Sequence, residues 1–518
     1  PGDGDDGTPD GPGPGDGDDG TPDGPGPGDG NDGTPDGPGP GDGNDGTPDG
    51  PEPGDGDDGT PDGPEPGDGD DGTPDDPDSD GGDPDGAPGS GATDEDSHDQ
   101  EAASIDLFVN GKAAWKGAAV AMEVDGQHVI VVTVDSDGLR ERLEQEGNGA
   151  LLTIPMEGEA DVVIGELDGR MVKAMVQQQA VLEVRTEDAS YTIPAQQIDI
   201  DAVRAQLGPD AALQDVKVRI EISSPAADEA KRAAEAADRE AIAIVVPPLR
   251  FTITGTYQGR TVEVSGFDAY VERRMALPES VDPERISTGV VIEPDGSLRH
   301  VPTRVDVING RDYAVMESLT NSLYAVIWHP VRFADVAGHW AEEAVHDMGS
   351  RLVVNGMQGG LYRPDVAITR AEFAAILVRG LGLATADGAS PFTDVQPGAW
   401  YSDAVNTAYA HGLVDGYGNG RFHPDATITR EQAMGMIANT MGMADLAQRM
   451  PGGAPEPGLQ AFDDAGDASA WAVPAIEKTI RAGLITGRTE HLLAPKQPIT
   501  RAEAAVIVGR LLTRAGLI

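Results

Sequence analysis

Between residues 104 and 330, short stretches rich in β-branched residues, some alternating with polar ones, indicate strands. The clearest are HVIVVTV (128–134), VKVRIEI (216–222), RFTITGTY (250–257) and YAVIWHP (324–330). The DG and NG dipeptides in EPDGSL (293–298) and INGRDY (308–313) favour hairpin turns. Residues 169–179 and 228–241 have helical composition instead. The pattern predicts an α+β or mainly-β region at 104–330.

This middle region contains few sequence motifs that would indicate catalysis or ligand binding. It contains no nucleophile elbow, no zinc-protease motif and no phosphate-binding glycine loop. His300 and His329 stand alone, so we expect both to be structural. A pair of glycosidase carboxylates stays open, because sequence alone cannot select two residues from dozens. We predict no catalytic residue, no metal and no cofactor, and the default reading is an adhesive or spacer module.

From residue 333 the hydrophobic pattern changes to helical spacing and occurs three times. Each copy opens with Phe-x-Asp, continues to a Trp, and reaches an Ile-Thr-Arg sequence 30 residues after that Trp. The aspartates are Asp335, Asp394 and Asp464, the tryptophans are Trp340, Trp400 and Trp471, and the arginines are Arg370, Arg430 and Arg501. The proposed repeats span 331–390, 391–450 and 459–518.

Each repeat reads as helix, loop, helix, and a capping box marks the second helix. The boxes are Thr369-x-x-Glu372, Thr429-x-x-Gln432 and Thr500-x-x-Glu503. The second repeat reads TREQ where the others read TRAE, which keeps the box. One such unit is too small to bury its apolar face. The three are therefore predicted to close around a shared core as an all-α pseudo-threefold bundle.

The boxes place an arginine at the first helical position, where the helix dipole disfavours a cation by up to about 1 kcal/mol. A guanidinium beside free backbone N–H groups would form an anion site. Pairing of each arginine with the aspartate of its own repeat is the alternative hypothesis. For the tryptophans, core packing and a role as a sugar-stacking platform both stay open.

Charge is distributed unevenly along the chain, whose net charge is -55. Residues 1–101 contain 34 acidic residues and no Lys or Arg, in a 13-residue repeat of Gly, Asp and Pro. We predict that 1–103 is a disordered, extended linker, and that residues 1–80 do not bind calcium specifically because the EF-hand spacing is absent. The acidity argues against nucleic acid and anionic membranes as partners. No apolar run is long enough to span a membrane.

The repeats resemble the S-layer homology domain, through the Phe-x-Asp opening, the Trp, the Pro-containing loop and the Ile-Thr-Arg-Ala-Glu box. The resemblance implies a bundle whose grooves hold secondary cell wall polysaccharide, typically with a pyruvate ketal on a terminal N-acetylmannosamine. By this resemblance the arginines would contact the carboxylate, the tryptophans would pack the sugar, and the aspartates would hold hydroxyls or the arginine. Backbone N–H groups would contribute near Gly356, Gly416 and Gly487. The third repeat departs furthest from the pattern.

The sequence therefore predicts a secreted protein anchored non-covalently to the wall of a Gram-positive-type bacterium. Two alternatives stay open. One is an anchored polysaccharide-active enzyme, with its catalytic part upstream or within 104–330. The other is a lattice subunit that associates with itself in a surface layer.

Overall fold

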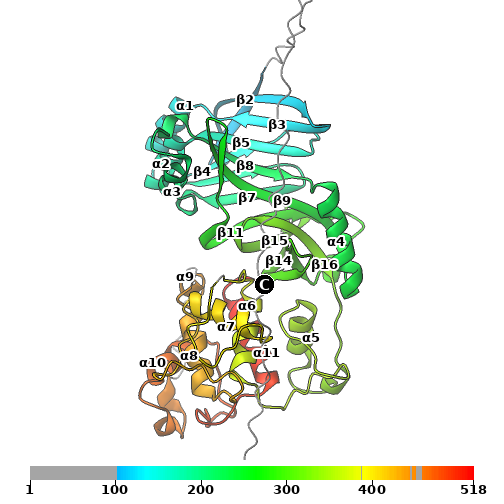
Figure 1. The fold of residues 1–518 in the computed structure, drawn as a ribbon, viewed down its shortest axis with the longest axis vertical. Helices are drawn as coiled ribbons and strands as arrows, with labels where there is room; N and C mark the ends of the chain where they lie inside the picture. The colour runs from blue at the N-terminus through cyan, green and yellow to red at the C-terminus, as the bar shows by residue number, and fades with distance from the viewer. Residues whose placement is uncertain (1–101, 387, 444–445, 451–457) are drawn as a thin grey trace, which may run out of the picture. The chain divides into compact units, whose positions relative to one another are not determined.

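The computed structural model describes residues 102–386, 388–443, 446–450 and 458–518 (Figure 1). The acidic repeat, with its predicted disorder and predicted lack of calcium binding, lies outside these residues. The described chain contains a β-rich region followed by a helical region that begins near residue 331.

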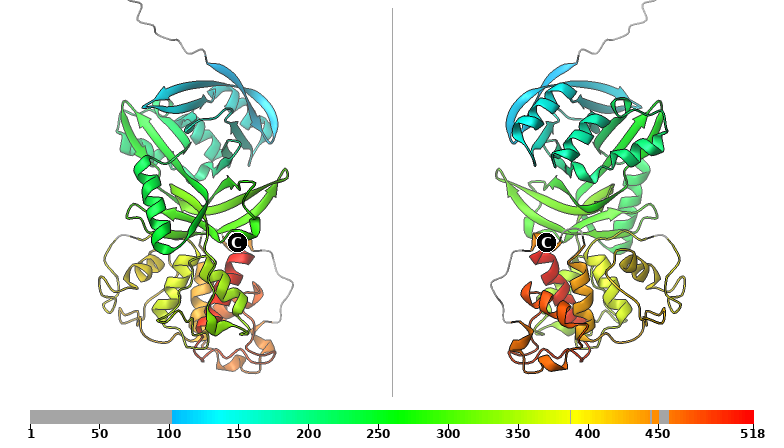
Figure 2. Two further views of the ribbon diagram at one scale, coloured as in Figure 1. Left: turned by 90° about the vertical axis from the view of Figure 1, so that its right-hand side faces the viewer. Right: turned by 90° about the vertical axis from the view of Figure 1, so that its left-hand side faces the viewer.

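The β-rich region is a single mixed sheet of 16 strands, so of the two predicted classes the mainly-β one is confirmed. The strand order is β13-β12-β16-β9-β8-β5-β3-β2-β1-β4-β6-β7-β11-β15-β14, with β10 paired to β9. The pairs β3–β5 and β4–β6 are parallel, and every other pair is antiparallel. The sheet curves into a barrel-like layer (Figures 1 and 2).

The strands are β1 Ala103–Val109, β2 Lys112–Val124, β3 Gln127–Thr133, β4 Leu151–Pro155, β5 Val162–Asp168, β6 Val181–Arg185, β7 Ala189–Pro194, β8 Lys217–Ser223, β9 Ala243–Tyr257, β10 Arg260–Glu263, β11 Gly266–Ala276, β12 Thr288–Ile292, β13 Leu298–Val301, β14 Thr303–Ile308, β15 Arg311–Thr320 and β16 Ser322–Trp328. All four predicted strands are present, as β3, β8, β9 and β16. Both predicted turns join neighbouring hairpin strands, β12 to β13 and β14 to β15.

The helices of this region are α1 Ser136–Glu146, α2 Gly169–Gln177, α3 Ile200–Leu207 and α4 Ala227–Glu240, with short 3₁₀ turns at Ala195–Gln197, Leu213–Asp215 and Pro283–Arg285. The two predicted helices are α2 and α4. The carboxylate of Asp168 caps α2 by accepting from the N–H of Met171 at 2.8 Å. In α4 a stripe of small residues, Ala233, Ala236 and Ala237, is buried.

His300 lies in the core, 2% exposed, with its Nδ1 2.8 Å from the hydroxyl of Thr288. Burial lowers the pKa of this imidazole to about 3, and nearby Arg351 and Arg299 act in the same direction. The ring is therefore neutral at physiological pH, as a structural histidine would be. Within the described ranges, no group of three or more His, Asp or Glu residues is placed to hold a metal ion.

The helical region has α5 Glu342–Ser350, α6 Arg370–Gly380, α7 Ser402–Ala410, α8 Arg430–Thr440, α9 Leu446–Arg449, α10 Val473–Arg481 and α11 Arg501–Arg514. Single 3₁₀ turns lie at Ala334–Val336, Leu459–Ala461 and Ala465–Asp467. The helices α6, α8 and α11, called the box helices below, begin at the predicted arginines. All three capping boxes are formed in both directions, including the Gln432 version. No described helix is both long and apolar enough to cross a bilayer.

A ring of backbone hydrogen bonds joins the three repeats just before the box helices. The N–H of Ile428 donates to the carbonyl of Ile368, Ile368 donates to Ile499, and Ile499 donates back to Ile428, at 3.0–3.1 Å. The side chains of all three isoleucines are fully buried in one hydrophobic cluster that draws on every repeat. Each repeat therefore depends on the other two for both its backbone hydrogen bonds and its core.

Deletion of residues 460–518 should unfold residues 331–459, because it opens the isoleucine ring and removes the partner against which α5 and α6 pack. We expect amide hydrogen exchange in α6 and α8 to lose its slow component relative to the full chain, while the sheet keeps its protection. Native-like protection of α6 and α8 in the truncated chain would show that two repeats suffice.

Candidate functional site

The box arginines are buried at the junctions between repeats. Arg370, Arg430 and Arg501 are only 8%, 5% and 6% exposed. The Nη2 atom of each donates to a carbonyl in the loop of another repeat, directly before the glycine that the resemblance singled out. These acceptors are Asp415, Thr486 and Asn355, at 2.6, 2.5 and 2.7 Å respectively. The arginines are therefore buried, because the loop of a neighbouring repeat packs across each helix start.

The backbone N–H groups at these helix starts are also occupied. In α6 the N–H groups of Arg370 and Ala371 donate to the carbonyls of Ala426 and Pro424 in the second repeat. The α8 start is capped in the same way by the third repeat, and the α11 start by the first. The third N–H of each helix is taken by the threonine of the capping box. The free N–H groups of the anion-site hypothesis are absent at these positions, so only the guanidinium remains for a ligand.

The aspartates do not pair with the arginines, so that alternative is also wrong. Asp394 accepts from the backbone N–H groups of Phe422 and His423 in its own repeat, at 2.8 and 2.9 Å. Asp335 and Asp464 make the same pair of bonds to their own loops. For Asp335 and Asp394, burial alone would raise the carboxyl pKa, but the two N–H donors hold it below its ordinary value.

Each aspartate fixes a strained loop residue. Arg363, His423 and Ala494 have φ of 57–59°, a left-handed conformation that costs a non-glycine residue roughly 1 kcal/mol or more. Each stands directly before the proline whose carbonyl caps the neighbouring box helix. The aspartate therefore acts at a distance from the grooves, by aiming a helix-capping carbonyl at the next repeat.

The predicted glycines are required for close packing. A β-carbon at Gly416 would lie 2.4 Å from the ring of Phe392, and one at Gly356 would lie 2.9 Å from Phe333. The phenylalanine of each Phe-x-Asp opening thus packs on the loop glycine of its own repeat. Because the preceding carbonyl faces the arginine, the glycine N–H of that trans peptide points away from the guanidinium.

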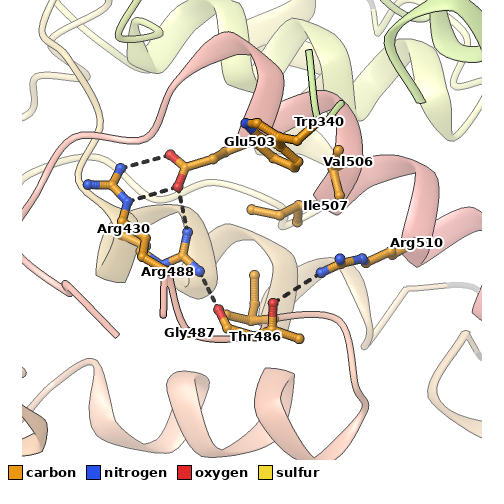
Figure 3. A pocket seen from close by; sticks show the side chains of 10 residues that line it. Trp340, Arg430, Thr486, Gly487, Arg488, Glu503, Val506, Ile507 and Arg510 are labelled. Carbon is orange, nitrogen blue, oxygen red and sulfur yellow. Dashed lines mark hydrogen bonds and ion pairs between the residues drawn. The ribbon is translucent and has the colours of Figure 1, made fainter. Parts of the chain in front are cut away.

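Two cavities open beside the buried arginines, and each is assembled from all three repeats. The first, which we call the Arg430 groove, has a volume of about 470 Å³ (Figure 3). It is lined by Trp340, Arg430, Ile485, Thr486, Gly487, Arg488, Glu503, Val506, Ile507 and Arg510. The second, the Arg370 groove, has a volume of about 320 Å³ and is lined by Arg370, Asp415, Gly416, Tyr417, Gln432, Gly435, Met436, Asn439, Trp471 and Ala475. The repeat that supplies the tryptophan supplies neither the arginine nor the loop.

The tryptophans are exposed, which removes core packing as their role. Trp340 and Trp400 are each 65% exposed and Trp471 is 59% exposed. Trp340 and Trp471 stand at the grooves described above, so each groove combines an exposed indole with a buried guanidinium. Such a pairing suits a ring with an acidic or hydroxyl substituent, because aromatic faces pack on apolar ring faces and the guanidinium provides directed donors.

The arginines differ in how far the protein already occupies them. All three nitrogen atoms of the Arg501 guanidinium donate hydrogen bonds: Nε to the carbonyl of Tyr362, Nη1 to the carboxylate of Glu372 and Nη2 to the carbonyl of Asn355. The Nε atoms of Arg370 and Arg430 are buried and have no hydrogen-bond partner among the described residues. Burial lowers the pKa of both of these guanidinium groups, although each stays protonated. Arg370 and Arg430 therefore have hydrogen-bonding capacity that the described residues do not use.

Several lining residues escaped the sequence reasoning. Gln432 and Asn439 line one groove, and Glu503 and Arg510 line the other. The available clue was their seven-residue spacing, which places two side chains on one face of a helix. Arg488 was missed as well, although it directly follows the predicted Gly487.

Comparison with known proteins identifies the repeats. Residues 332–374, 391–434 and 461–505 match the S-layer homology domain. An amylopullulanase of Thermoanaerobacterium thermosulfurigenes is 29% identical over 48% of this chain and 13% of its own length. The exoglucanase XynX of Acetivibrio thermocellus is 32% identical over 38% of this chain and 18% of its own. A surface-layer 125 kDa protein of Lysinibacillus sphaericus is 30% identical over 34% of this chain and 14% of its own length.

The chain thus carries three S-layer homology domains within residues 332–505. Together with the surface-layer relatives, they indicate anchoring at the cell wall, as the sequence predicted. The matches span less than a fifth of the length of the three relatives described.

Replacing Asp394 with Ala should destabilise the helical region by about 2–3 kcal/mol, because two partly buried backbone donors lose a charged acceptor. Asn should recover part of this loss, since its one carbonyl oxygen can still accept. The measurement is chemical denaturation followed by helical circular dichroism. If D394A were as stable as the parent protein but bound walls poorly, Asp394 would belong to the ligand site instead of the loop.

Proposed function

We propose that the three S-layer homology domains bind an anionic secondary cell wall polysaccharide in their grooves, and that the bound group is a carboxylate such as a pyruvate ketal. The observation that carries this proposal is the pairing of an exposed tryptophan with a buried, incompletely bonded arginine in one cavity. The Arg430 groove with Trp340 and the Arg370 groove with Trp471 both have it.

The energetics favour an anion beside these arginines. A buried guanidinium with unused donors is costly, because its desolvation is not offset by hydrogen bonds. A carboxylate that enters the cavity supplies acceptors in the bidentate geometry that arginine prefers. The ring that carries this carboxylate would then pack against the indole at the groove.

The remaining residues of the predicted site take supporting roles. The aspartates and glycines shape the loops whose carbonyls hold the arginines. Arg501 closes the junction between the third and first repeats, and the cyclic order of the repeats would place Trp400 beside it. This order supports the predicted pseudo-threefold arrangement. We assign Arg501 a smaller part in binding because Tyr362, Glu372 and Asn355 already accept hydrogen bonds from its guanidinium.

The relatives named as an amylopullulanase and an exoglucanase favour a second proposal, in which the same domains hold a polysaccharide-active enzyme at the wall. A longer reading frame with a catalytic domain, or hydrolysis of a polysaccharide by residues 104–330, would support it. Relatives named as surface-layer proteins leave a lattice subunit as a competitor, for which ordered two-dimensional arrays of purified protein are the test.

Arg370→Ala and Arg430→Ala should each weaken binding to purified cell walls roughly tenfold to a hundredfold, the value of a charge-assisted bidentate contact. Lys should restore only part, since it keeps the charge but loses the fork. Because both arginines bridge repeats, binding must be measured by co-sedimentation at a temperature where circular dichroism shows the variant folded. The control is Tyr362→Phe, which removes the hydroxyl bond to the Arg501 carbonyl and lies outside both cavities. Folded alanine variants that bind as tightly as the parent would refute the proposal.

Trp340→Ala and Trp471→Ala should lower wall affinity about tenfold with little change in melting temperature, because exposed side chains contribute little to the core. The same co-sedimentation and thermal denaturation measurements apply. Normal binding by the double variant would exclude the tryptophans from the ligand site.

A further inference from the structure

The two grooves share one design but differ in charge. In the Arg430 groove, the third and tenth residues of the adjoining box helix are Glu503 and Arg510. The corresponding residues in the Arg370 groove are the uncharged Gln432 and Asn439. These positions face the cavity in both cases, so the difference bears directly on what each groove can hold.

The loops reinforce the difference. In the Arg430 groove the residue after the loop glycine is Arg488, and the residue before it is Thr486. In the Arg370 groove the same two positions are Tyr417 and Asp415. The lining of the Arg430 groove thus carries three arginines and one glutamate, while that of the Arg370 groove carries one arginine and one aspartate.

Most of the positive charge in the Arg430 groove is already engaged. Glu503 accepts from Arg430 at 3.2 Å and from both Nε and Nη2 of Arg488 at 2.8 Å (Figure 3). Burial alone would raise the pKa of Glu503, but Arg488, the Thr500 N–H and Arg430 hold it below its ordinary value. Glu503 is therefore ionised, and it ties two of the arginines together.

Arg510 is the exception. Among the described residues, the Arg510 side chain has a single hydrogen-bond partner, the hydroxyl of Thr486 at a long 3.4 Å from Nη1, and it forms no ion pair with a carboxylate. It is also exposed, at the same cavity as Trp340. A guanidinium so placed keeps most of its fork for a carboxylate that enters from solvent.

The Arg370 groove has the opposite character. The guanidinium of Arg370 lies over the rings of Tyr417 and Phe422, with 5.3 and 4.8 Å to the ring centroids. The side-chain amide of Gln432 donates to the hydroxyl of Tyr417 at 3.1 Å. With Trp471 also in the lining, this groove offers aromatic surface and neutral hydrogen-bonding groups, and Asp415 opposes a second anion.

We propose that the grooves differ in selectivity: the Arg430 groove, with Arg510 as an additional contact, strongly prefers the acidic unit of the glycan, while the Arg370 groove, with one arginine and one aspartate, prefers it weakly and also accepts an uncharged sugar unit. This inference rests on the proposed function, because it assumes that both grooves bind wall glycan. It assigns to Arg510 a role that the Ile-Thr-Arg-Ala-Glu box does not include.

The test compares the affinities of the full chain for purified wall polysaccharide and for the same polymer after chemical reduction of its carboxyl groups to alcohols. Arg510→Asn, which copies the residue of the Arg370 groove, should lower the preference for the acidic polymer about tenfold. The reciprocal variant Asn439→Arg should raise that preference. Arg481→Asn makes the same charge change at an exposed position outside both linings, and should leave the preference as it is.

Each result either supports or overturns one of the two proposals. An unchanged preference in R510N would overturn the inference while leaving wall binding intact. If R510N fails to fold, the reciprocal variant alone decides, and no gain in acid preference there overturns the inference. A parent protein that binds neither polymer would instead overturn the proposed function.

Discussion

The helical region depends on how the first N–H groups of the box helices are satisfied. Every helix leaves these donors without an intrahelical partner, and here a loop from a different repeat supplies the acceptors. The second repeat caps α6, the third caps α8, and the first caps α11. Because the order is cyclic, no repeat supplies the acceptors for the first two N–H groups of its own box helix. The capping requirement therefore enforces the closure that the shared hydrophobic core stabilises.

This closure also creates the grooves. A loop that caps a helix start must cross it closely, which buries the arginine at the first helical position and directs its Nη2 to a loop carbonyl. Arg370 and Arg430 then each line a cavity whose indole comes from the third partner. The strained residue held by each aspartate contributes indirectly, because it sets the position of the capping carbonyl. Fold and binding site thus rest on the same interaction.

The sequence predicted local features well and junction features poorly. Capping boxes, box helices, four strands and two hairpin turns follow from short patterns, and the structure contains all of them. The burial of Arg370 was not predictable, because its neighbours Asp415, Tyr417 and Phe422 lie more than 40 residues away in the sequence. The role of the aspartates was not predictable for a similar reason. Sequence spacing does not distinguish a carboxylate that accepts hydrogen bonds from a loop backbone and a carboxylate that faces a guanidinium. Whether a helix start is free or capped is decided between repeats.

The sequence TREQ in the second repeat shows how repeats can diverge without losing their fold. Gln432 retains the capping box but removes the carboxylate that the third repeat offers to Arg430 and the first offers to Arg501. Glu431, which replaces an alanine, is 5% exposed and accepts from Ser469 and Lys496 of the third repeat. Glu431 therefore strengthens the junction between the second and third repeats, while Gln432 changes the charge of the Arg370 groove. Helix capping tolerates both residues, which leaves these positions open to variation in what each groove binds.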